Sequence, residues 1–470
     1  MANMDTLPVA VIGAGPVGLA AAAHLLARGL EPVIFERGDA AGATIADWAH
    51  VRIFSPWEYN IDAAARGLLE SVGWSMPQPD HIPTGGELIR DYLAPLAAHP
   101  SIAPRLQLKA EVVSVSRKDH SRLGSDDRED APFVIVWRDG NGRRNTMLAR
   151  AVIDASGTWI RPNPIGLDGL PVEGEVENAD RIAYGIPDVL GAQRDRYAGC
   201  HTLVVGAGHS AINAALDLMA LRDEKPDTRI TWATRAGGVE RLLGGGLGDE
   251  LPGRGRLGLR AAEAIRSGHV TLRSPFAVRR IEASAGGLSV EAEENGRPVT
   301  LDVDRIVVAT GFRPDLSILG ELRLSLDPVV ETTPKLAPLI DPNLHSCGTV
   351  RPHGVVELAH PEKDFYIVGM KSYGRAPTFL MTTGYEQVRS IVAELAGDHA
   401  AAREVRLKLP ETGVCKTGSV LGDACCGSPL KTPEPATSGC GGPSKVDVTA
   451  CCAADATAKS AGAGGCGCRR

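Results

Sequence analysis

The stretch LPVAVIGAGPVGLAAAAHLLARGLEPVIFERG, residues 7–38, decides the fold. Its β-branched run up to Ile12 predicts a buried strand, and the Ala-rich segment from Pro16 to Arg28 has helical periodicity. A second apolar run, ending in Glu36, has the length of another strand. Strand, helix and strand in this order predict a βαβ unit of an α/β fold with a parallel sheet.

The turn between the first strand and the helix has the pattern GxGxxG. We expect Gly13 to permit the tight turn, Gly15 to let the backbone approach a pyrophosphate, and Gly18 to let the helix pack on the strand. The free amides at the start of the helix would hold the phosphates. Glu36 lies about 20 residues further on, where a carboxylate can accept both ribose hydroxyls of an adenosine. These residues predict a dinucleotide site.

Residues 200–238, CHTLVVGAGHSAINAALDLMALRDEKPDTRITWATRAGG, repeat the pattern. Gly206 and Gly208 take the first two glycine positions, and Ala211 replaces the third glycine. Ser210 is expected to cap the helix. The sequence therefore predicts a second Rossmann-like unit.

The second strand of this unit ends in Thr234 and Arg235 instead of an acid. A guanidinium can pair with a 2′-phosphate that a carboxylate would repel, so the residues favour NADPH. NADH is the alternative if Arg235 is only a solvated loop residue. The neighbouring His209 is expected to be a loop side chain beside the phosphates rather than an acid or base.

Two such units imply two dinucleotides, one that donates electrons and one that receives them. Nicotinamide passes hydride to a flavin, so we expect FAD at the N-terminal site and NADPH at the internal site.

With these two loops, the chain resembles the two-dinucleotide-binding-domain flavoproteins, which include flavin-containing monooxygenases and thioredoxin-reductase-like enzymes. The resemblance covers roughly residues 5–400 and includes VIDASGTW (152–159) and IVVATGFRPD (306–315), where the chain is expected to cross between domains. It also includes DFYIVGM (364–370), ahead of an expected helix MTTGYEQVRSIVAEL.

The resemblance implies that the turn at Gly369 and Met370 lies near the flavin, although many relatives carry Gly-Asp there. It also implies a discontinuous FAD domain, residues 1–165 and 310–405, and an NAD(P)H domain, residues 198–309. The implied fold class is α/β, with two Rossmann-like domains of the disulfide-reductase and monooxygenase architecture.

The positions of the cysteines limit which electron acceptor the flavin can use. No cysteine precedes Cys200 and the body carries no CxxC pair, so a dithiol relay against the flavin is excluded. Electrons are expected to go directly to dioxygen, a quinone, a metalloid or an organic substrate. In monooxygenase-like relatives the acceptor is dioxygen.

Residues 42–67 supply Trp48, Arg52, Trp57 and Tyr59, either as a lining for the isoalloxazine or as ordinary packing. The FxGxxxHxxx(W/Y) signature of monooxygenases is absent, and RIAYGIPDVLGAQRDRYAGC stands in its place. The chain is therefore an outlier or a distinct branch of that class.

Residues 410–470 lose all periodicity and are dominated by small and polar residues, so we expect a flexible arm. Six of its eight cysteines are adjacent or one residue apart, which does not match structural zinc but suits soft ions such as Cu(I), mercury or trivalent arsenic. The combination resembles flavoproteins of bacterial arsenic-resistance operons; the alternative is an incidental extension. The candidate ligands are Cys425, Cys426, Cys451, Cys452, Cys466 and Cys468.

The net charge of −7, without a basic block, argues against nucleic acid or an anionic membrane as a partner. The apolar run from Val9 to Ala27 contains glycines and no basic flank, so we expect no membrane span and a cytoplasmic protein.

The sequence predicts an FAD- and NADPH-dependent oxidoreductase, monooxygenase-like, that acts on a small molecule or a metalloid with dioxygen as co-substrate. One alternative is an NADPH-dependent reductase of a quinone or metalloid without oxygen transfer. The other is a thiol-rich metal-binding protein with an inactive flavin fold. No catalytic side chain is identified.

Overall fold

The computed structural model describes residues 4–235, 252–343, 350–376 and 379–407. These residues belong to one compact unit, Met1–Lys416. None of the described helices combines the length and apolar character that crossing a membrane requires. The cysteine-rich segment 410–470 and Cys347 lie outside the described residues.

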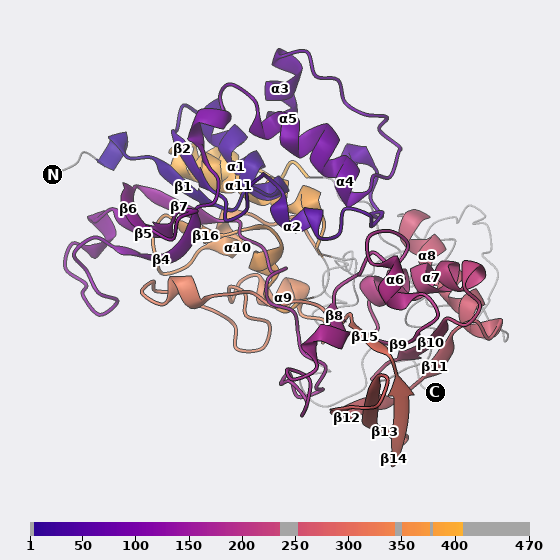
Figure 1. The fold of residues 1–470 in the computed structure, drawn as a ribbon. Helices are drawn as coiled ribbons and strands as arrows, with labels where there is room; N and C mark the ends of the chain where they lie inside the picture. The colour runs from indigo at the N-terminus through magenta and orange to yellow at the C-terminus, as the bar shows by residue number, and fades with distance from the viewer. Residues whose placement is uncertain (1–3, 236–251, 344–349, 377–378, 408–470) are drawn as a thin grey trace, which may run out of the picture. The chain divides into compact units, whose positions relative to one another are not determined.

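The N-terminal βαβ unit begins a five-stranded, wholly parallel sheet (Figure 1). Its order along the sheet is β16 (Phe365–Ile367), β7 (Ala151–Asp154), β1 (Val9–Ile12), β2 (Pro32–Phe35) and β3 (Leu106–Gln107). Strands far apart in the sequence are thus neighbours, because β7 and β16 extend the sheet on the far side of β1. The central strands β1 and β7 are buried along their whole length, as expected for a parallel sheet covered on both faces.

Helices α1 (Pro16–Ala27) and α11 (Met381–Leu395) pack together in the apolar core of this sheet. Alanines on α1 let the helix approach closely, and Ala20, Ala21 and Ala22 are fully buried. The predicted helix MTTGYEQVRSIVAEL is confirmed, since α11 covers the same residues. The other helices of this region are α2 (Ala43–Ala46), α3 (Ala63–Ser71), α4 (Gly85–Leu88), a π-helix η3 (Ile89–Leu93), α5 (Ala94–Ala97), α9 (Ala337–Ile340), α10 (Val355–Leu358) and α12 (His399–Arg403).

The second βαβ unit lies in another five-stranded parallel sheet. The order is β11 (Thr271–Arg273), β10 (Arg229–Ala233), β9 (His201–Val205), β15 (Arg305–Val308) and β8 (Ile182–Tyr184). Its helices are α6 (Arg194–Tyr197), α7 (His209–Glu224) and α8 (Pro252–Arg266), and α7 packs on α8. The predicted fold class, α/β with two Rossmann-like sheets, is confirmed.

Each parallel sheet is accompanied by a three-stranded antiparallel sheet that we did not predict. The first is β4 (Glu111–Arg117), β5 (Phe133–Arg138) and β6 (Arg144–Ala149), and it shares an apolar cluster with the first parallel sheet. The second is β12 (Phe276–Ala283), β13 (Leu288–Glu294) and β14 (Arg297–Val303), and it shares a cluster with the second.

Short 3₁₀ helices occupy several connections between these elements. They are η1 (Met4–Thr6), η2 (Trp57–Tyr59), η4 (Ala103–Arg105), η5 (Arg128–Asp130), η6 (Ala179–Arg181), η9 (Ser317–Leu319) and η10 (Gly369–Tyr373). The last of these, η10, begins two residues after the end of β16 and so lies at the carboxyl edge of the first sheet.

Candidate functional site

The three glycines of the first loop have three different surroundings. Gly13 has φ +99°, and a Cβ there would lie 2.7 Å from the carbonyl oxygen of Ala155. A Cβ at Gly18 would lie 1.9 Å from the carbonyl oxygen of Gly13, so the start of α1 touches the loop. A Cβ at Gly15 would meet nothing within 4 Å. Two of the glycines are thus required by the protein's own packing, and the third borders open space.

The first turn of α1 has no side-chain cap. Gly15 is the N-cap residue and Pro16 follows it at the first helical position. The backbone amides that begin a helix lack intrahelical partners, and here no side chain of the N-cap residue accepts from them. They can therefore bind an anion, which is the chemistry that a pyrophosphate requires.

Glu36 lies directly after β2 and is only 8% exposed. Its Oε2 accepts a hydrogen bond from the backbone N–H of Ala14 at 2.8 Å, and its Oε1 accepts one from Gly38 at 2.7 Å. A carboxylate has about four acceptor positions, so it can accept two further donors. The residues of this loop therefore fit an adenosine with its ribose hydroxyls on Glu36.

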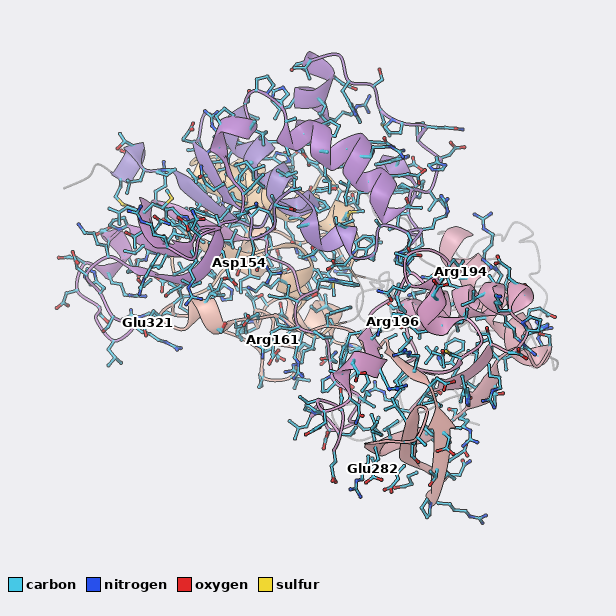
Figure 2. All side chains as sticks on the ribbon, in the orientation of Figure 1. Asp154, Arg161, Arg194, Arg196, Glu282 and Glu321 are labelled. Atoms are coloured by element: carbon cyan, nitrogen blue, oxygen red, sulfur yellow. The ribbon has the colours of Figure 1, made fainter. Side chains whose placement is uncertain are left out.

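The carboxyl ends of β1, β7 and β16 lie at the same edge of the sheet. Asp154, labelled in Figure 2, pairs in register with Ile12 of β1 on one side and with Ile367 of β16 on the other. The glycine loop follows Ile12 directly, and the turn at Gly369 and Met370 begins two residues after Ile367. The predicted turn and the glycine loop are thus brought to one edge, where ligands bind in such sheets.

The turn after β16 is held by a buried polar network that we did not predict. Gly369 has φ +66°, and its N–H donates to Oε1 of Gln387 on α11 at 2.8 Å. Nε2 of Gln387 donates to Oγ of Ser372 and to Nε2 of His353, both at 2.9 Å. Burial lowers the pKa of His353, which keeps its Nε2 free as an acceptor. The backbone at Met370 is therefore fixed by side chains from two other segments.

A second polar group at this edge was also missed. Lys371, immediately after Met370, donates to Asp154 at 2.7 Å. Asp154 stands within VIDASGTW, and a lysine after the Gly-Met turn is visible in the sequence. Nothing local relates the two residues, because they are 217 positions apart.

In the second glycine loop, as in the first, one glycine is required by packing and another borders open space. Gly206 has φ +141°, and a Cβ there would lie 2.3 Å from the carbonyl oxygen of Ala309. Gly208 borders open space, while Ala211 is fully buried at the helix-packing position. The expectation that Ser210 caps the helix is wrong. Gly208, in an extended conformation, is the N-cap of α7, so Ser210 already lies inside the first turn.

Thr234 and Arg235 directly follow β10, at the carboxyl edge of the second sheet. Thr234 is buried, and its Oγ1 donates to Oγ of Ser274 at 2.8 Å. Arg235 is exposed. The structure thus places the exposed guanidinium of Arg235 at the edge where the glycine loop lies.

His209 is the first residue of α7 and is exposed. Its ring centroid lies 5.4 Å from that of Phe54, which belongs to the aromatic segment of residues 42–67. The side chain therefore stands at the start of the helix, next to an aromatic ring.

The aromatic residues of segment 42–67 divide between packing and a more open group. Trp57 is 1% exposed and belongs to the core, so the packing interpretation holds for it. Trp48 is half-buried, with its ring centroid 6.3 Å from that of Trp159. Trp159 stacks on Phe312 at 4.4 Å and donates its indole N–H to Asp47 at 2.9 Å.

Arg52 and Tyr59 are the other two candidates of this segment. Arg52 is exposed and donates to the carbonyl of Ile82. Tyr59 is half-buried at the end of η2.

The segments after β7 and β15 pair with each other. Pro162 forms an antiparallel bridge with Phe312, and the N–H of Asn163 donates to the carbonyl of Gly311 at 2.9 Å. Arg161, labelled in Figure 2, forms an ion pair with Asp315 at 3.1 Å. The segment that follows VIDASGTW is therefore hydrogen-bonded to the motif IVVATGFRPD.

The candidate metal ligands Cys425, Cys426, Cys451, Cys452, Cys466 and Cys468 lie outside the described residues. Within the described part of the chain, no group of three or more His, Cys, Asp or Glu side chains could hold a metal ion. Cys200 is described and is a free, partly buried thiol.

The chain belongs to the pyridine nucleotide-disulphide oxidoreductase family, whose pattern matches residues 10–347. Flavin-containing monooxygenase 3 of Macaca mulatta is 28% identical over 217 residues, which are 45% of this chain and 37% of that protein. The chain thus matches less than half of the length of this known relative.

Two solved structures share the fold. The bacillithiol disulfide reductase Bdr (YpdA) of Bacillus cereus has a TM-score of 0.62 at 18% identity, over 83% of this chain and 99% of that one. The ornithine N-hydroxylase KtzI of Kutzneria sp. 744, solved with reduced FAD, NADP⁺ and L-ornithine, has a TM-score of 0.55 at 16% identity, over 83% and 100%. At these identities the likeness concerns the fold.

The family and the relative bear out the flavoprotein resemblance and the oxidoreductase class expected from the sequence. FAD and NADPH, the two cofactors expected from the sequence, agree with the family and with the relative. The family name refers to disulfides, but the body of this chain contains no CxxC or CxxxxC pair.

Proposed function

We propose that the protein is an FAD- and NADPH-dependent oxidoreductase of the monooxygenase-like type. The observation that carries the proposal is the pair of glycine loops, each at the carboxyl edge of a parallel sheet and each with a middle glycine that borders open space. The name of the Macaca mulatta relative and the cofactors in the Kutzneria structure support the same assignment.

FAD is assigned to the first loop. Gly13 and Gly18 shape it, Gly15 admits the pyrophosphate to the amides of α1, and Glu36 accepts the ribose hydroxyls. Gly369 follows β16, two strands from β1 at the same edge, and the backbone of the Gly-Met turn is assigned a contact with the cofactor.

Met370 stands where many relatives carry an acid, and it is only partly buried. A thioether cannot accept a ribityl hydroxyl as a carboxylate would. We therefore assign it a van der Waals contact with the cofactor rather than a polar one.

NADPH is assigned to the second loop. Gly206 and Gly208 form the turn, and the start of α7, including Ser210, binds the pyrophosphate through backbone amides. Arg235 pairs with the 2′-phosphate, because it is exposed and follows β10 at the loop's edge of the sheet.

These assignments carry a domain proposal with them. Residues 1–165 and 310–405 form the discontinuous FAD domain, and residues 198–309 form the NAD(P)H domain. The hydrogen-bonded segments at Pro162 and Phe312 are the two chain crossings. Residues 410–470, expected from the sequence to form an arm, lie outside the described residues.

FAD, once reduced by NADPH, supplies electrons one or two at a time to dioxygen or to another acceptor. The body of the chain offers no CxxC pair to take those electrons, which favours direct transfer to a small molecule or a metalloid. The half-buried Trp48, Trp159 and Phe312 supply apolar surface that can exclude water from a substrate.

Anaerobic reduction by NADPH followed by rapid mixing with oxygen tests the proposal. Bleaching of bound flavin by NADPH, and a transient absorbance that precedes the oxidised spectrum, are the expected results. Reoxidation in a single step would support the alternative, an NADPH-dependent reductase of a quinone or metalloid. Failure of NADPH to bleach the flavin would contradict both and leave a metal-binding protein with an inactive flavin fold.

Arsenic or metalloid detoxification is the specific role that we propose for the cysteine-rich segment. Adjacent thiols suit thiophilic ions such as trivalent arsenic, and a tethered trap raises the effective concentration of its cargo near a flavin. The candidate ligands are Cys425, Cys426, Cys451, Cys452, Cys466 and Cys468.

A chain that ends at Leu407 keeps the last described contacts of the body. Arg389 on α11 donates to the carbonyls of Ala401 and Glu404, so a chain ending at Leu407 keeps these anchors. Arsenite titration of free thiols should give fewer reactive thiols in the full chain and no change in the chain ending at Leu407. An equal loss of reactive thiols in the two proteins would contradict the proposed arsenite trap.

A further inference from the structure

Lys371 is a buried cation at the carboxyl edge of the first sheet. Its side chain is 1% exposed, and the carboxylate of Asp154 is fully buried. The Nζ donates to Oδ2 of Asp154 at 2.7 Å and to Oγ of Ser156 at 3.0 Å. Oδ1 of Asp154 accepts from the N–H of Ser156 at 3.1 Å and from its hydroxyl at 2.6 Å. Both oxygens of the carboxylate are therefore satisfied.

The ammonium group is not fully satisfied by the protein. It has three donors, and the described residues provide acceptors for two of them. Burial would raise the pKa of Asp315, but hydrogen bonds from Ser317 and the charges of Arg161 and Lys371 hold it below its ordinary value. The positive charge of Lys371 therefore stabilises the carboxylate of Asp315, although the two side chains make no hydrogen bond in the described structure.

The position of this group connects it with the glycine loop. Asp154 lies in register between Ile12 and Ile367, the residues that lead into the loop and into the Gly369 turn. Ala155, between the acid and Ser156, has its carbonyl 2.7 Å from where a Cβ of Gly13 would be. The group thus stands against the loop proposed to bind the diphosphate.

The stability of the folded protein does not by itself explain the buried ion pair of Lys371 and Asp154. Replacing a buried ion pair by apolar residues is often neutral or stabilising, because desolvation of both charges offsets their attraction. A buried lysine with a free donor is better explained by an anionic ligand that arrives at this edge.

We propose that Lys371 is the anion-binding group of the FAD site. Its third N–H donates to an anionic part of the bound cofactor, either the diphosphate or the reduced isoalloxazine. Asp154 and Ser156 are positioning residues that hold the ammonium in place. The inference rests on the proposed function, since it requires FAD at this edge.

Lys371→Met in the purified full chain tests it, with Lys363→Met as the matched control. Lys363 lies on the same segment but is exposed. The measurements are the Kd of FAD for the apoprotein, the Kd of riboflavin, the midpoint potential of bound flavin and the melting temperature of the apoprotein. The control should leave all four unchanged.

Each source of the anion predicts its own result. If the diphosphate is bound, Lys371→Met weakens FAD binding by ~10-fold or more, leaves riboflavin binding unchanged and keeps the midpoint potential. If the reduced isoalloxazine is bound, the midpoint potential becomes more negative while the affinity for oxidised FAD is kept. If the variant has a lower melting temperature but keeps the wild-type Kd of FAD and the wild-type midpoint potential, the proposal is overturned. Lys371 and Asp154 then form a structural ion pair only.

A double variant covers the case in which the single one fails to fold. Lys371→Met with Asp154→Asn leaves no unpaired buried charge, so it should fold. It should show the same change in FAD affinity or potential, and wild-type values in it would also overturn the proposal. If wild-type protein itself binds no FAD, the proposed function fails, which is a different outcome from equal FAD binding in wild type and variants.

Discussion

The carboxylate of Glu36 accepts a hydrogen bond from the backbone N–H of Ala14 at 2.8 Å, so the acid after β2 contacts the glycine loop after β1. Its other oxygen accepts from Gly38. The acid therefore braces the loop even without a ligand, and its remaining lone pairs are available to hydroxyl donors. Glu36 thus fixes the geometry of the glycine loop and can also bind the ribose hydroxyls.

Replacing Glu36 by Gln should weaken FAD binding more than it weakens the fold. The amide loses the charge and turns an NH₂ group toward a backbone N–H or a ribose hydroxyl, so we expect ~10-fold or greater loss of FAD affinity. Fluorescence titration of apoprotein with FAD measures it. Glu58→Gln, at an exposed position, is the control, and an equal affinity in both variants would contradict the role of Glu36.

Gly15→Ala and Gly18→Ala should separate ligand binding from folding. A methyl group at Gly18 would meet the carbonyl of Gly13 at 1.9 Å, so this variant should be destabilised or unfolded. A methyl group at Gly15 meets no protein atom, so the apoprotein should melt near the wild-type temperature but lose FAD affinity. Gly67→Ala, inside α3 with open space around it, should be neutral or stabilising by up to about 1 kcal/mol. Retained FAD binding in Gly15→Ala would argue against a cofactor at this loop.

Arg235→Ala should raise the KM for NADPH ~10-fold or more and leave the KM for NADH nearly unchanged, because only NADPH carries the 2′-phosphate. Steady-state or anaerobic reduction of the flavin with each nucleotide measures the ratio. Arg229→Ala is the control, since Arg229 is exposed at the opposite end of β10. A parallel rise for both nucleotides would assign Arg235 to general phosphate attraction instead.

The fold was predictable where its signals are local. Strand β1 and helix α11 follow the predicted runs, because apolar periodicity and glycine turns are encoded in consecutive residues. The antiparallel sheets β4–β6 and β12–β14 were not predicted. Strands β4 and β12 each contain a register shift, which obscures the period of two, whereas β13 alternates buried and less buried residues regularly.

The candidate site was predictable only in its loops. The misplaced cap at Ser210 shows how a local rule fails by two residues, because the extended glycine takes the cap position itself. The contacts of Lys371 with Asp154 and of Gln387 with Gly369 join separate elements, and no spacing rule relates them. Such groups are found only when the sheet order is known.

Stability should fall as the pH is lowered from about 6.5 toward 4. Burial lowers the pKa of His360 to about 4, and burial also lowers the pKa of His353 and of His201. In this window the unfolded state binds protons that the folded state excludes, so stability present above the unfolded pKa is lost as the pH falls. The shift of His360 corresponds to about 3 kcal/mol at its full extent.

Urea unfolding of the wild type and of His360→Phe across this pH range checks the assignment. The variant keeps a ring beside Phe365, whose centroid lies 5.8 Å from that of His360. Its free energy of unfolding should depend less steeply on pH between 6.5 and 4. An identical slope in both proteins would show that other groups govern the acid response.

Glu362→Gln should be strongly destabilising, because one carboxylate neutralises two buried guanidinium groups. Glu362 is bound by Arg117 and by Arg128, each at 2.8 Å, and all three side chains are at most 3% exposed. Arg117 also lies over the ring of Phe133, 3.7 Å from its centroid, so it cannot move into water without leaving the core. Removing the negative charge leaves buried cations without compensation, and we expect a loss of about 3–5 kcal/mol in the free energy of unfolding. Glu331→Gln is the control, since its pair with Arg375 is partly exposed and should be worth at most about 1 kcal/mol. Similar urea midpoints for the two variants would mean that the arginines find other partners.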